Sequence, residues 1–373
     1  MDLPSSWVIE QKALTAMSFI TFFLVILPLP GYIRVRNIGC SLYASWIAFL
    51  CFSSFINGIL WRDHARNIAP IWCEIYIRLQ WAGSMGILSA GLVIARRVSN
   101  IANSTFILHS DDQRRAMFTD LAIGLVPPIS QLIEFWFVQG HRFDIFEGLG
   151  CFAIVPFSIL SICLTWGWNL IIGILSATYC VRTIIALLRR HKDIKKVLTM
   201  TKMDLQLFHR LVAMAIVEMM GTVPLVTYVI VSAAPGYYPW NGFADLHLDF
   251  NRIDQFPYGL WSVIYKGYRP DTIVWFQIGC GLLFFGLLGL TRDACSRYKR
   301  MFGLSKLFTD SNEKSDGAPS SREPRSLVFW HPRSNPEESN ATFATISSRW
   351  SLAEISSTKI KQQSQRHDEE SVV

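Results

Sequence analysis

Residues 13–32 read ALTAMSFITFFLVILPLPGY, twenty consecutive residues without a charge. A helix of about twenty apolar residues, at about 1.5 Å per residue, matches the roughly 30 Å hydrocarbon core of a bilayer. The stretch lacks a basic start and ends in Leu-Pro-Gly rather than at a small-residue cleavage site. We therefore interpret it as a membrane span and not as a cleaved signal peptide.

Six further apolar segments of similar length follow along the chain. They cover residues 41–60, 68–95, 119–138, 164–188, 211–233 and 272–290. Residues 151–188 hold a single charge in 38 residues, which is too long for one span. We therefore divide this region near residue 163 and place its first part, with Pro156, in a loop folded over the bundle. The pattern predicts an all-α membrane protein with a seven-transmembrane helix bundle.

The net charge of +7 and the pI near 9.0 would suit a nucleic-acid-binding protein, so the positions of the charges decide. The loops at 33–39, 96–118 and 189–210 carry thirteen Lys or Arg, whereas the opposite side of the predicted bundle carries seven. Basic residues are retained on the cytoplasmic side of a membrane. We therefore expect an extracellular amino terminus, a location in the plasma membrane and no nucleic-acid partner.

The chain is predicted to have three parts. Residues 1–12 form an extracellular amino-terminal segment, residues 13–300 form the seven-helix domain, and residues 301–373 form a cytoplasmic tail. Residues 309–373 hold 18 Ser or Thr, many charges and few apolar clusters. This composition is typical of a disordered segment, and its hydroxyl groups are candidate phosphorylation sites.

Motifs of membrane enzymes and of cofactor proteins are missing. The last predicted span has no Lys for a retinal Schiff base, and no two His stand at the spacing of a zinc site. The sequence also lacks a Gly-rich phosphate loop and a Gly-x-Ser-x-Gly elbow. We therefore expect no enzymatic activity, no cofactor and no metal, and we interpret the histidines as solvated or structural.

Few charges lie inside the predicted spans, and a charge in hydrocarbon needs a partner or water. Glu74 and Arg78 are four residues apart, so they share one helix face. They could line a ligand cleft or only neutralise each other. Asp120 lies one residue from the end of its predicted span, and we expect it to be solvated.

A second pair of charges lies near the predicted cytoplasmic rim. Arg182 on the fifth span and Glu218 on the sixth are each about 10 Å from the rim, so they could pair across the two helices in an inactive state. Pro224 supplies a kink about which the inner end of the sixth helix could swing. In the alternative, Arg182 extends to the rim and Glu218 meets a hydroxyl group.

The second outer loop carries the most specific motif, QGHRFDIFEGLGC at residues 139–151. Shorter motifs accompany it: Trp-Cys-Glu at 72–74, Arg-Leu at 78–79, Arg-Arg at 96–97 and at 189–190, and Tyr-Pro-Trp at 238–240. Over roughly residues 10–300 the sequence resembles the fungal (basidiomycete-like) mating pheromone receptors of the a-factor type, a fungal class of G-protein-coupled receptors. No Asp-Arg-Tyr follows the third span and no Asn-Pro-x-x-Tyr closes the seventh, as in that family.

The resemblance implies a receptor that binds a lipidated (farnesylated) peptide pheromone and signals through a heterotrimeric G protein. Such a ligand needs an apolar crevice with a few polar groups at the outer face. The ligand-binding residues that we expect there are Glu74, Arg78, His141, Arg142, Phe143, Asp144, Trp240 and His247.

Cysteines stand on both predicted faces of the membrane. Cys73 and Cys151 fall on the outer, oxidising side, where a disulfide would pin the second outer loop over the ligand cleft. Two free buried thiols are the alternative. Cys295 stands among basic residues after the last span and is a candidate for palmitoylation.

The predicted cytoplasmic loop at 189–210 carries seven Lys or Arg. We expect Arg189, Arg190, Lys195 and Lys196 to contact the G protein, with membrane lipid as the alternative partner of this basic surface. A second receptor copy is also a candidate partner. An orphan seven-helix receptor for another ligand and a small-solute transporter are the alternative functions.

Overall fold

The structure is a computed structural model that describes residues 5–103, 110–189, 205–264 and 271–301. The chain divides into two compact units, Met1–Phe329 and Trp330–Val373, and every described residue belongs to the first unit. The predicted tail lies almost wholly outside the described residues, so its disorder stays a prediction.

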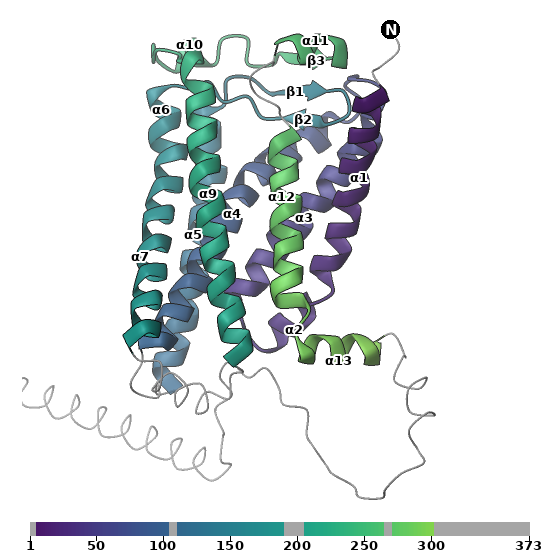
Figure 1. The fold of residues 1–373 in the computed structure, drawn as a ribbon. Coiled ribbons are helices and arrows are strands. Elements are labelled where there is room, and N and C mark those ends of the chain that lie inside the picture. Colours follow the sequence, from purple (N-terminus) through teal and green to yellow (C-terminus); the bar gives the residue numbers. More distant parts are fainter. Residues whose placement is uncertain (1–4, 104–109, 190–204, 265–270, 302–373) are drawn as a thin grey trace, which may run out of the picture. The chain divides into compact units, whose positions relative to one another are not determined.

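Long helices form the body of the described unit (Figure 1). They are α1 (Ser5–Ile26), α3 (Ile38–Leu60), α4 (Pro70–Asn103), α5 (Ser110–Val138), α7 (Gly167–Arg189), α9 (Leu205–Ala233) and α12 (Asp271–Phe284). Within the described residues, six helical stretches are long and apolar enough to cross a membrane, and α9 adds a shorter apolar stretch at Gln206–Val217. The predicted fold class is confirmed.

Short elements extend or connect these helices. They are α2 (Leu29–Arg34), α6 (Ile159–Ser161), η1 (Ile162–Trp166), η2 (Ala234–Gly236), α10 (Phe243–Leu246), α11 (Tyr258–Ile264), η3 (Phe285–Gly289) and α13 (Arg292–Met301). Two of them are π-helical: η1 leads directly into α7, and η3 directly follows α12. α1 ends two residues before Pro28, because a proline disfavours the helical conformation of the residue that precedes it.

Several helices begin earlier than their apolar segments predict, and the difference is largest for α1 and α5. α1 begins at Ser5, so most of the predicted amino-terminal segment 1–12 is helical, and α5 begins at Ser110. Hydropathy marks only the part of a helix that needs a bilayer, whereas backbone hydrogen bonds continue through polar residues outside it.

α4 is the central helix of the bundle, and it packs against α3, α5, α7 and α9. Its apolar window is the most buried of the candidate spans, at 72%. Gly83 faces Leu50 of α3, and Gly86 faces Trp46, whose indole ring a Cβ atom would overlap. Small residues let helix backbones approach closely in membranes, where there is no hydrophobic force between helices.

One end of the bundle is covered by what we term the cap, residues 139–158 and 237–264 (Figure 1). Its strands are β1 (Phe143–Phe146), β2 (Gly150–Phe152) and β3 (Ile253–Phe256), in the order β2-β1-β3. β1 pairs antiparallel with β2 and parallel with β3, which sets Asp144 opposite Asp254. The sequence predicts a loop over the bundle but not this sheet, since strands of three or four residues leave no clear period.

The opposite end of the bundle holds a charge cluster around Asp120. Asp120 of α5 is 1% exposed, and each of its carboxylate oxygens accepts a hydrogen bond from an arginine of α4, Arg96 or Arg97. The expectation that Asp120 is solvated is therefore wrong. A carboxylate near the end of one helix can be buried when a neighbouring helix supplies two guanidinium groups, and a single helix does not reveal this.

At the same end, side chains from three elements donate hydrogen bonds to the carbonyl groups at the end of η3 and just after it. Tyr32 Oη of α2 donates to the Leu288 carbonyl at 2.8 Å, Arg210 Nη1 of α9 to Leu290 at 2.9 Å, and Tyr298 Oη of α13 to Gly289 at 3.0 Å. Burial raises the pKa of Tyr298 to about 12, so its hydroxyl keeps the donated proton. The last carbonyl groups of a helix have no partner within it, and these donors supply one.

Candidate functional site

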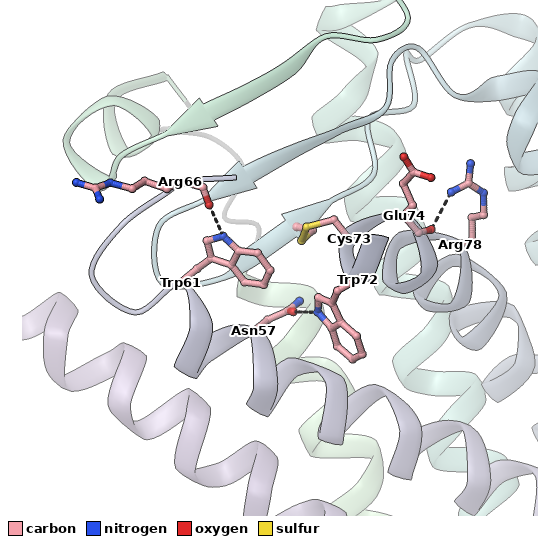
Figure 2. Close-up of a disulfide and its surroundings, with 8 residues drawn as sticks. Asn57, Trp61, Arg66, Trp72, Cys73, Glu74 and Arg78 are labelled. Atoms are coloured by element: carbon pink, nitrogen blue, oxygen red, sulfur yellow. Dashed lines mark hydrogen bonds between the residues drawn. A yellow bond between two sulfur atoms is a disulfide. The ribbon is translucent and has the colours of Figure 1, made fainter. Parts of the chain in front are cut away.

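A disulfide joins the cap to the central helix. Cys73 lies in the first turn of α4 and Cys151 in β2, with 5.4 Å between their Cα atoms, and both are fully buried (Figure 2). Apolar side chains surround the bond, among them Trp61, Tyr76, Phe135, Phe143 and Ile145. The sequence predicts this pairing, and the structure contains it.

Two tryptophans beside the disulfide tie α3 to the cap and to α4 (Figure 2). Trp61 Nε1 donates to the Arg66 carbonyl at 2.9 Å, and its own carbonyl accepts from the Gly148 N–H at 2.7 Å. Trp72 Nε1 donates to Asn57 Oδ1 at 2.7 Å. The loop after α3 is thus held against the turn between β1 and β2.

The predicted pair of Glu74 and Arg78 forms differently from the expectation. Arg78 Nη1 donates at 2.8 Å to the backbone carbonyl of Glu74, not to its carboxylate (Figure 2). The Glu74 carboxylate instead accepts two hydrogen bonds from Arg142 of the cap, one of them from Nε at 2.8 Å. The helical spacing suggests an ion pair between Glu74 and Arg78, and this partner is wrong. The actual partner, Arg142, comes from a distant part of the chain, so the spacing within one helix does not reveal it.

The cap brings three metal-ligating side chains together. His141 Nε2 and Asp144 Oδ1 are 2.6 Å apart, both residues are buried, and Asp254 of β3 completes a group whose ligand atoms lie within 4.8 Å of one another. Arg252 Nε lies 3.0 Å from Asp254 Oδ2. Such a group could offer three ligands to a divalent cation.

Trp240 and His247 belong to a separate aromatic cluster at the rim of the cap. Phe243 lies between them, with ring centroids 5.0 Å from Trp240 and 6.1 Å from His247. His247 also packs against Trp136 of α5 at 5.1 Å. The hydroxyl of Tyr238 donates to the Asp245 carboxylate, which raises the pKa of Tyr238. These side chains are partly exposed and remain available to a ligand.

Phe143, in contrast, is fully buried in the cluster around the disulfide. It contributes to the core beneath the cap, and its expected role as a ligand contact has no support in this geometry. His141 and Asp144 are also buried, at 6% and 3% exposed, so they position the cap strands rather than face solvent.

The structure adds contacts and a cavity that the sequence does not predict. Glu134 of α5 accepts from Gln131 Nε2 at 2.6 Å and from Trp168 Nε1 at 3.2 Å, which links α5 to α7 inside the bundle. Between α1 and α3 lies a cavity of about 550 Å³ whose lining includes Trp7 and Gln11. The two residues fall in a segment that the sequence analysis places outside the membrane, so only the packing of α1 under the cap reveals them.

The expected switch and coupling residues are only partly described. Arg182 and Arg189 are exposed on α7, and Pro224 is exposed within α9. The side chain of Glu218 and the whole of Arg190, Lys195 and Lys196 lie outside the described residues. Cys295 is a free, partly exposed thiol on α13. The coupling surface and the Arg182–Glu218 pair therefore stay predictions.

The six membrane-length apolar helices of the described residues, the shorter apolar stretch of α9 and the disulfide-pinned cap over one end are those of a multi-pass membrane protein. Comparison with known proteins identifies the family. The model of the pheromone A receptor family matches residues 13–308, and the chain belongs to this family. The resemblance recognised from the motifs is thereby confirmed, and the transporter alternative has no further support.

Three relatives illustrate the range of similarity. The pheromone B alpha 2 receptor of Schizophyllum commune is 31% identical over 318 residues, 84% of this chain and 49% of the relative. Pheromone receptor 1 of Mycosarcoma maydis is 26% identical, over 78% of this chain and 83% of the relative. The pheromone a factor receptor of Saccharomyces cerevisiae is 22% identical, over 91% of this chain and 72% of the relative. The chain spans about half the length of the Schizophyllum commune receptor.

Proposed function

We propose that the protein is a G-protein-coupled receptor for a lipidated peptide mating pheromone and that it acts without catalysis. The observation that carries the proposal is the cap: residues 139–151 form its core and are pinned to α4 by the disulfide, in a chain of the pheromone A receptor family. A rigid cap over a bundle provides a fixed surface on which a peptide can be recognised.

We further propose that the cap faces outward from the plasma membrane, with the amino terminus extracellular and the tail cytoplasmic. The excess of Lys and Arg in the loops at the opposite end supports this orientation. The disulfide supports it too, because such bonds persist in oxidising compartments. Glycosylation sequons at Asn103 and Asn340 would then face the cytoplasm and remain unmodified.

Partly exposed residues of the cap, together with Glu74 of α4, are the proposed peptide contacts. Glu74 and Arg142 form an ion pair about one third exposed, and Trp240 and His247 lie on the aromatic rim. A peptide with a mismatched charge would leave one of these groups unpaired, which discriminates between pheromones. Exchange of residues 139–163 and 234–271 between two receptors of different peptide preference should transfer the preference. If the exchange leaves the peptide preference of each receptor unchanged, the assignment of these contacts is contradicted.

Signal transfer requires a ligand that binds one state of the bundle more tightly than the other. We propose that the inner end of α9 moves outward about Pro224 and opens a binding site for a heterotrimeric G protein, which Arg189, Arg190, Lys195 and Lys196 would contact. Membrane lipid competes for the same basic residues. We also propose that Cys295 is palmitoylated and that the receptor associates with a second copy of itself.

The test is expression of the full chain in a receptor-null fungal reporter strain. Cells are challenged with a panel of farnesylated and unfarnesylated peptides while surface expression is measured with an epitope tag. A response to at least one farnesylated peptide is expected, and it should vanish in a strain that lacks the G-protein α subunit. Surface-expressed receptor that answers no peptide would contradict the proposal.

A further inference from the structure

The junction between the two segments of the cap carries a group of metal-ligating side chains. β1 belongs to the first segment, residues 139–158, and β3 belongs to the second, residues 237–264 (Figure 1). The long helices α7 and α9 separate these segments in the sequence. The side chains of His141, Asp144 and Asp254 therefore meet where two distant parts of the chain are joined.

Two carboxylates face each other across the paired strands. The parallel register of β1 and β3 sets Asp144 directly opposite Asp254. Like charges at directly opposite positions of a sheet destabilise the pairing. Asp144 is 3% exposed, so water screens its charge poorly. This pairing is stable when a positive charge or a proton lies between the two groups.

The neighbouring donors serve the two carboxylates unequally. His141 Nε2 lies 2.6 Å from Asp144 Oδ1, and a ring nitrogen carries at most one proton, so this nitrogen serves one carboxylate. Arg252 Nε lies 3.0 Å from Asp254 Oδ2, but the arginine side chain is 51% exposed, so it balances Asp254 from the solvent side. A cation among the three ligand atoms would contact both carboxylates at once, because these atoms lie within 4.8 Å of one another.

The donor set selects the kind of cation. One imidazole nitrogen and two carboxylate oxygens are zinc ligands, with bonds of about 2.0–2.2 Å, which place the ligand atoms of a tetrahedral site about 3.4 Å apart. The 2.6 Å hydrogen bond between His141 and Asp144 would open, and the longest separation of 4.8 Å would shorten. Ca²⁺ takes about six to eight oxygen ligands and Mg²⁺ requires octahedral geometry, so three ligands with one imidazole favour zinc.

The exposure of the three residues suits a cation that arrives from solvent. His141 is 6% exposed and Asp144 is 3% exposed, whereas the side chain of Asp254 is 36% exposed. The buried pair holds its ligand atoms in place, and Asp254 provides the access that a metal site needs. Three protein ligands also leave the fourth position of a tetrahedral zinc ion open to water.

We propose that His141, Asp144 and Asp254 bind a zinc ion that joins β1 to β3. The ion replaces the proton shared by His141 and Asp144 and neutralises the two facing carboxylates. The spacing of residues along the chain does not reveal this site, because one of its ligands comes from a strand that follows α9.

The site lies beside a proposed peptide contact. Arg142 stands between two of the proposed ligands, His141 and Asp144, and donates to the carboxylate of Glu74. A zinc ion on both neighbours would fix this part of the chain and hold Arg142 in position. Ordering a side chain before binding lowers the cost of binding, so zinc should increase sensitivity to the peptide. This consequence, unlike the zinc site itself, rests on the proposed function.

Zinc binding is measured on the purified full-length receptor in detergent. The receptor is purified through an epitope tag without a polyhistidine sequence, freed of metal with a chelator, and titrated with Zn²⁺ in competition with a fluorescent zinc indicator. We expect Zn²⁺ to bind and to raise the thermal midpoint, whereas Ca²⁺ and Mg²⁺ at the same concentration should leave the midpoint unchanged. A wild-type receptor that binds no zinc overturns the proposal.

Two substitutions of Asp254 distinguish a ligand from a structural residue, and they change the most exposed of the three ligands. Asp254→Asn should weaken the affinity for zinc at least about tenfold. Asp254→His supplies a new ligand atom and should restore an affinity close to that of the wild type. Asp249→Asn is the matched control, because it removes the same charge from an exposed residue of the same segment. Equal affinities of Asp254→Asn and wild type overturn the proposal.

X-ray absorption at the zinc edge of the wild-type receptor does not depend on the folding of a variant. The spectrum should show nitrogen and oxygen ligands at about 2.0–2.2 Å. Sulfur ligands at about 2.3 Å would assign the metal to cysteines and overturn the proposal.

The peptide response tests the effect on recognition. Cells are challenged with an activating peptide in medium that contains a cell-impermeant chelator, with and without excess Zn²⁺. Zinc should lower the half-maximal peptide concentration about threefold in wild type and in Asp249→Asn, but not in Asp254→Asn. A zinc-binding receptor whose response does not change with zinc overturns this effect. A wild type that binds zinc but answers no peptide contradicts the proposed function and supports the zinc site.

Discussion

Asp120 is the residue on which the end of the bundle opposite the cap depends most directly. Its carboxylate is 1% exposed and lies between two guanidinium groups that are each 18% exposed. Arg97 also donates to the Arg36 carbonyl at 3.4 Å, so the cluster reaches from α5 through α4 to the segment before α3. A carboxylate so buried is stable only while its counter-charges remain in place.

Asp120→Asn should therefore lower the thermal stability of the receptor. Two partly buried arginines lose their counter-charge, and removal of one member of a buried ion pair costs about 3 kcal/mol. The measurement is the thermal midpoint of purified receptor in detergent. Asp63→Asn is the matched control, because the Arg62–Asp63 pair is exposed and its loss is worth less than about 1 kcal/mol. Equal midpoints for the two variants would contradict the structural role of Asp120.

α9 is the element whose position distinguishes the proposed inactive and active states. Arg210, near its start, donates to the carbonyl groups of Leu287 and Leu290 at the end of η3. An outward movement of this end of α9 would break both hydrogen bonds. The contact thus holds α9 against the seventh helix in the described state.

Arg210→Gln should raise signalling in the absence of ligand. Loss of a hydrogen bond from a charged donor is worth about 1.5 kcal/mol, which shifts the balance between two states about tenfold. Basal reporter output per surface receptor measures this shift. His209→Gln, at the exposed neighbouring position, should leave basal output at the wild-type value. If the basal output of Arg210→Gln equals that of the wild type, the proposal that α9 moves outward from the seventh helix is contradicted.

The hypothesis of an Arg182–Glu218 pair is tested in the same assay. If the pair stabilises the inactive state, Glu218→Gln should raise basal output about fivefold for each 1 kcal/mol of lost pairing energy. Arg182→Gln should have a similar effect, and the double variant should exceed neither single variant. Unchanged basal output in Glu218→Gln would remove the pair from the mechanism.

At the scale of the whole molecule, the cap and the bundle form one structure because the disulfide and the β1–β3 pairing join distant parts of the chain. Cys73 and Cys151 are 78 residues apart, and β1 pairs with a strand that follows α9. In the proposed function, a peptide bound at the cap would contact residues that continue into α4, α5 and α9. This continuity would couple binding at one end of the bundle to the other end.

Loss of the disulfide should weaken both stability and response. Cys73→Ser releases a loop of this length, and the corresponding loss of stability is about 4 kcal/mol. Cys151→Ser and the double variant should match it, because all three remove the same bond. Cys163→Ser, which removes an exposed free thiol, is the control.

Thermal midpoint and peptide response are measured for the four variants, and peptide mapping without reduction shows the bond in wild type. Single variants that retain wild-type midpoint and response would contradict the role of the cap as a fixed platform.

The sequence alone determined the helices and their number, because a membrane requires long apolar segments that are local and readable one at a time. The resemblance to the family rests on motifs, above all residues 139–151. The sequence also indicated the Cys73–Cys151 pairing through the side of the membrane on which each cysteine falls. Only the tertiary structure decided that Asp120 is buried, that Glu74 pairs with Arg142 and not Arg78, that Phe143 is core, and that Gln11 lines a cavity. The reason is physical: each of these depends on which side chains distant segments bring together, and contact between packed helices and strands leaves no periodic trace in any one segment.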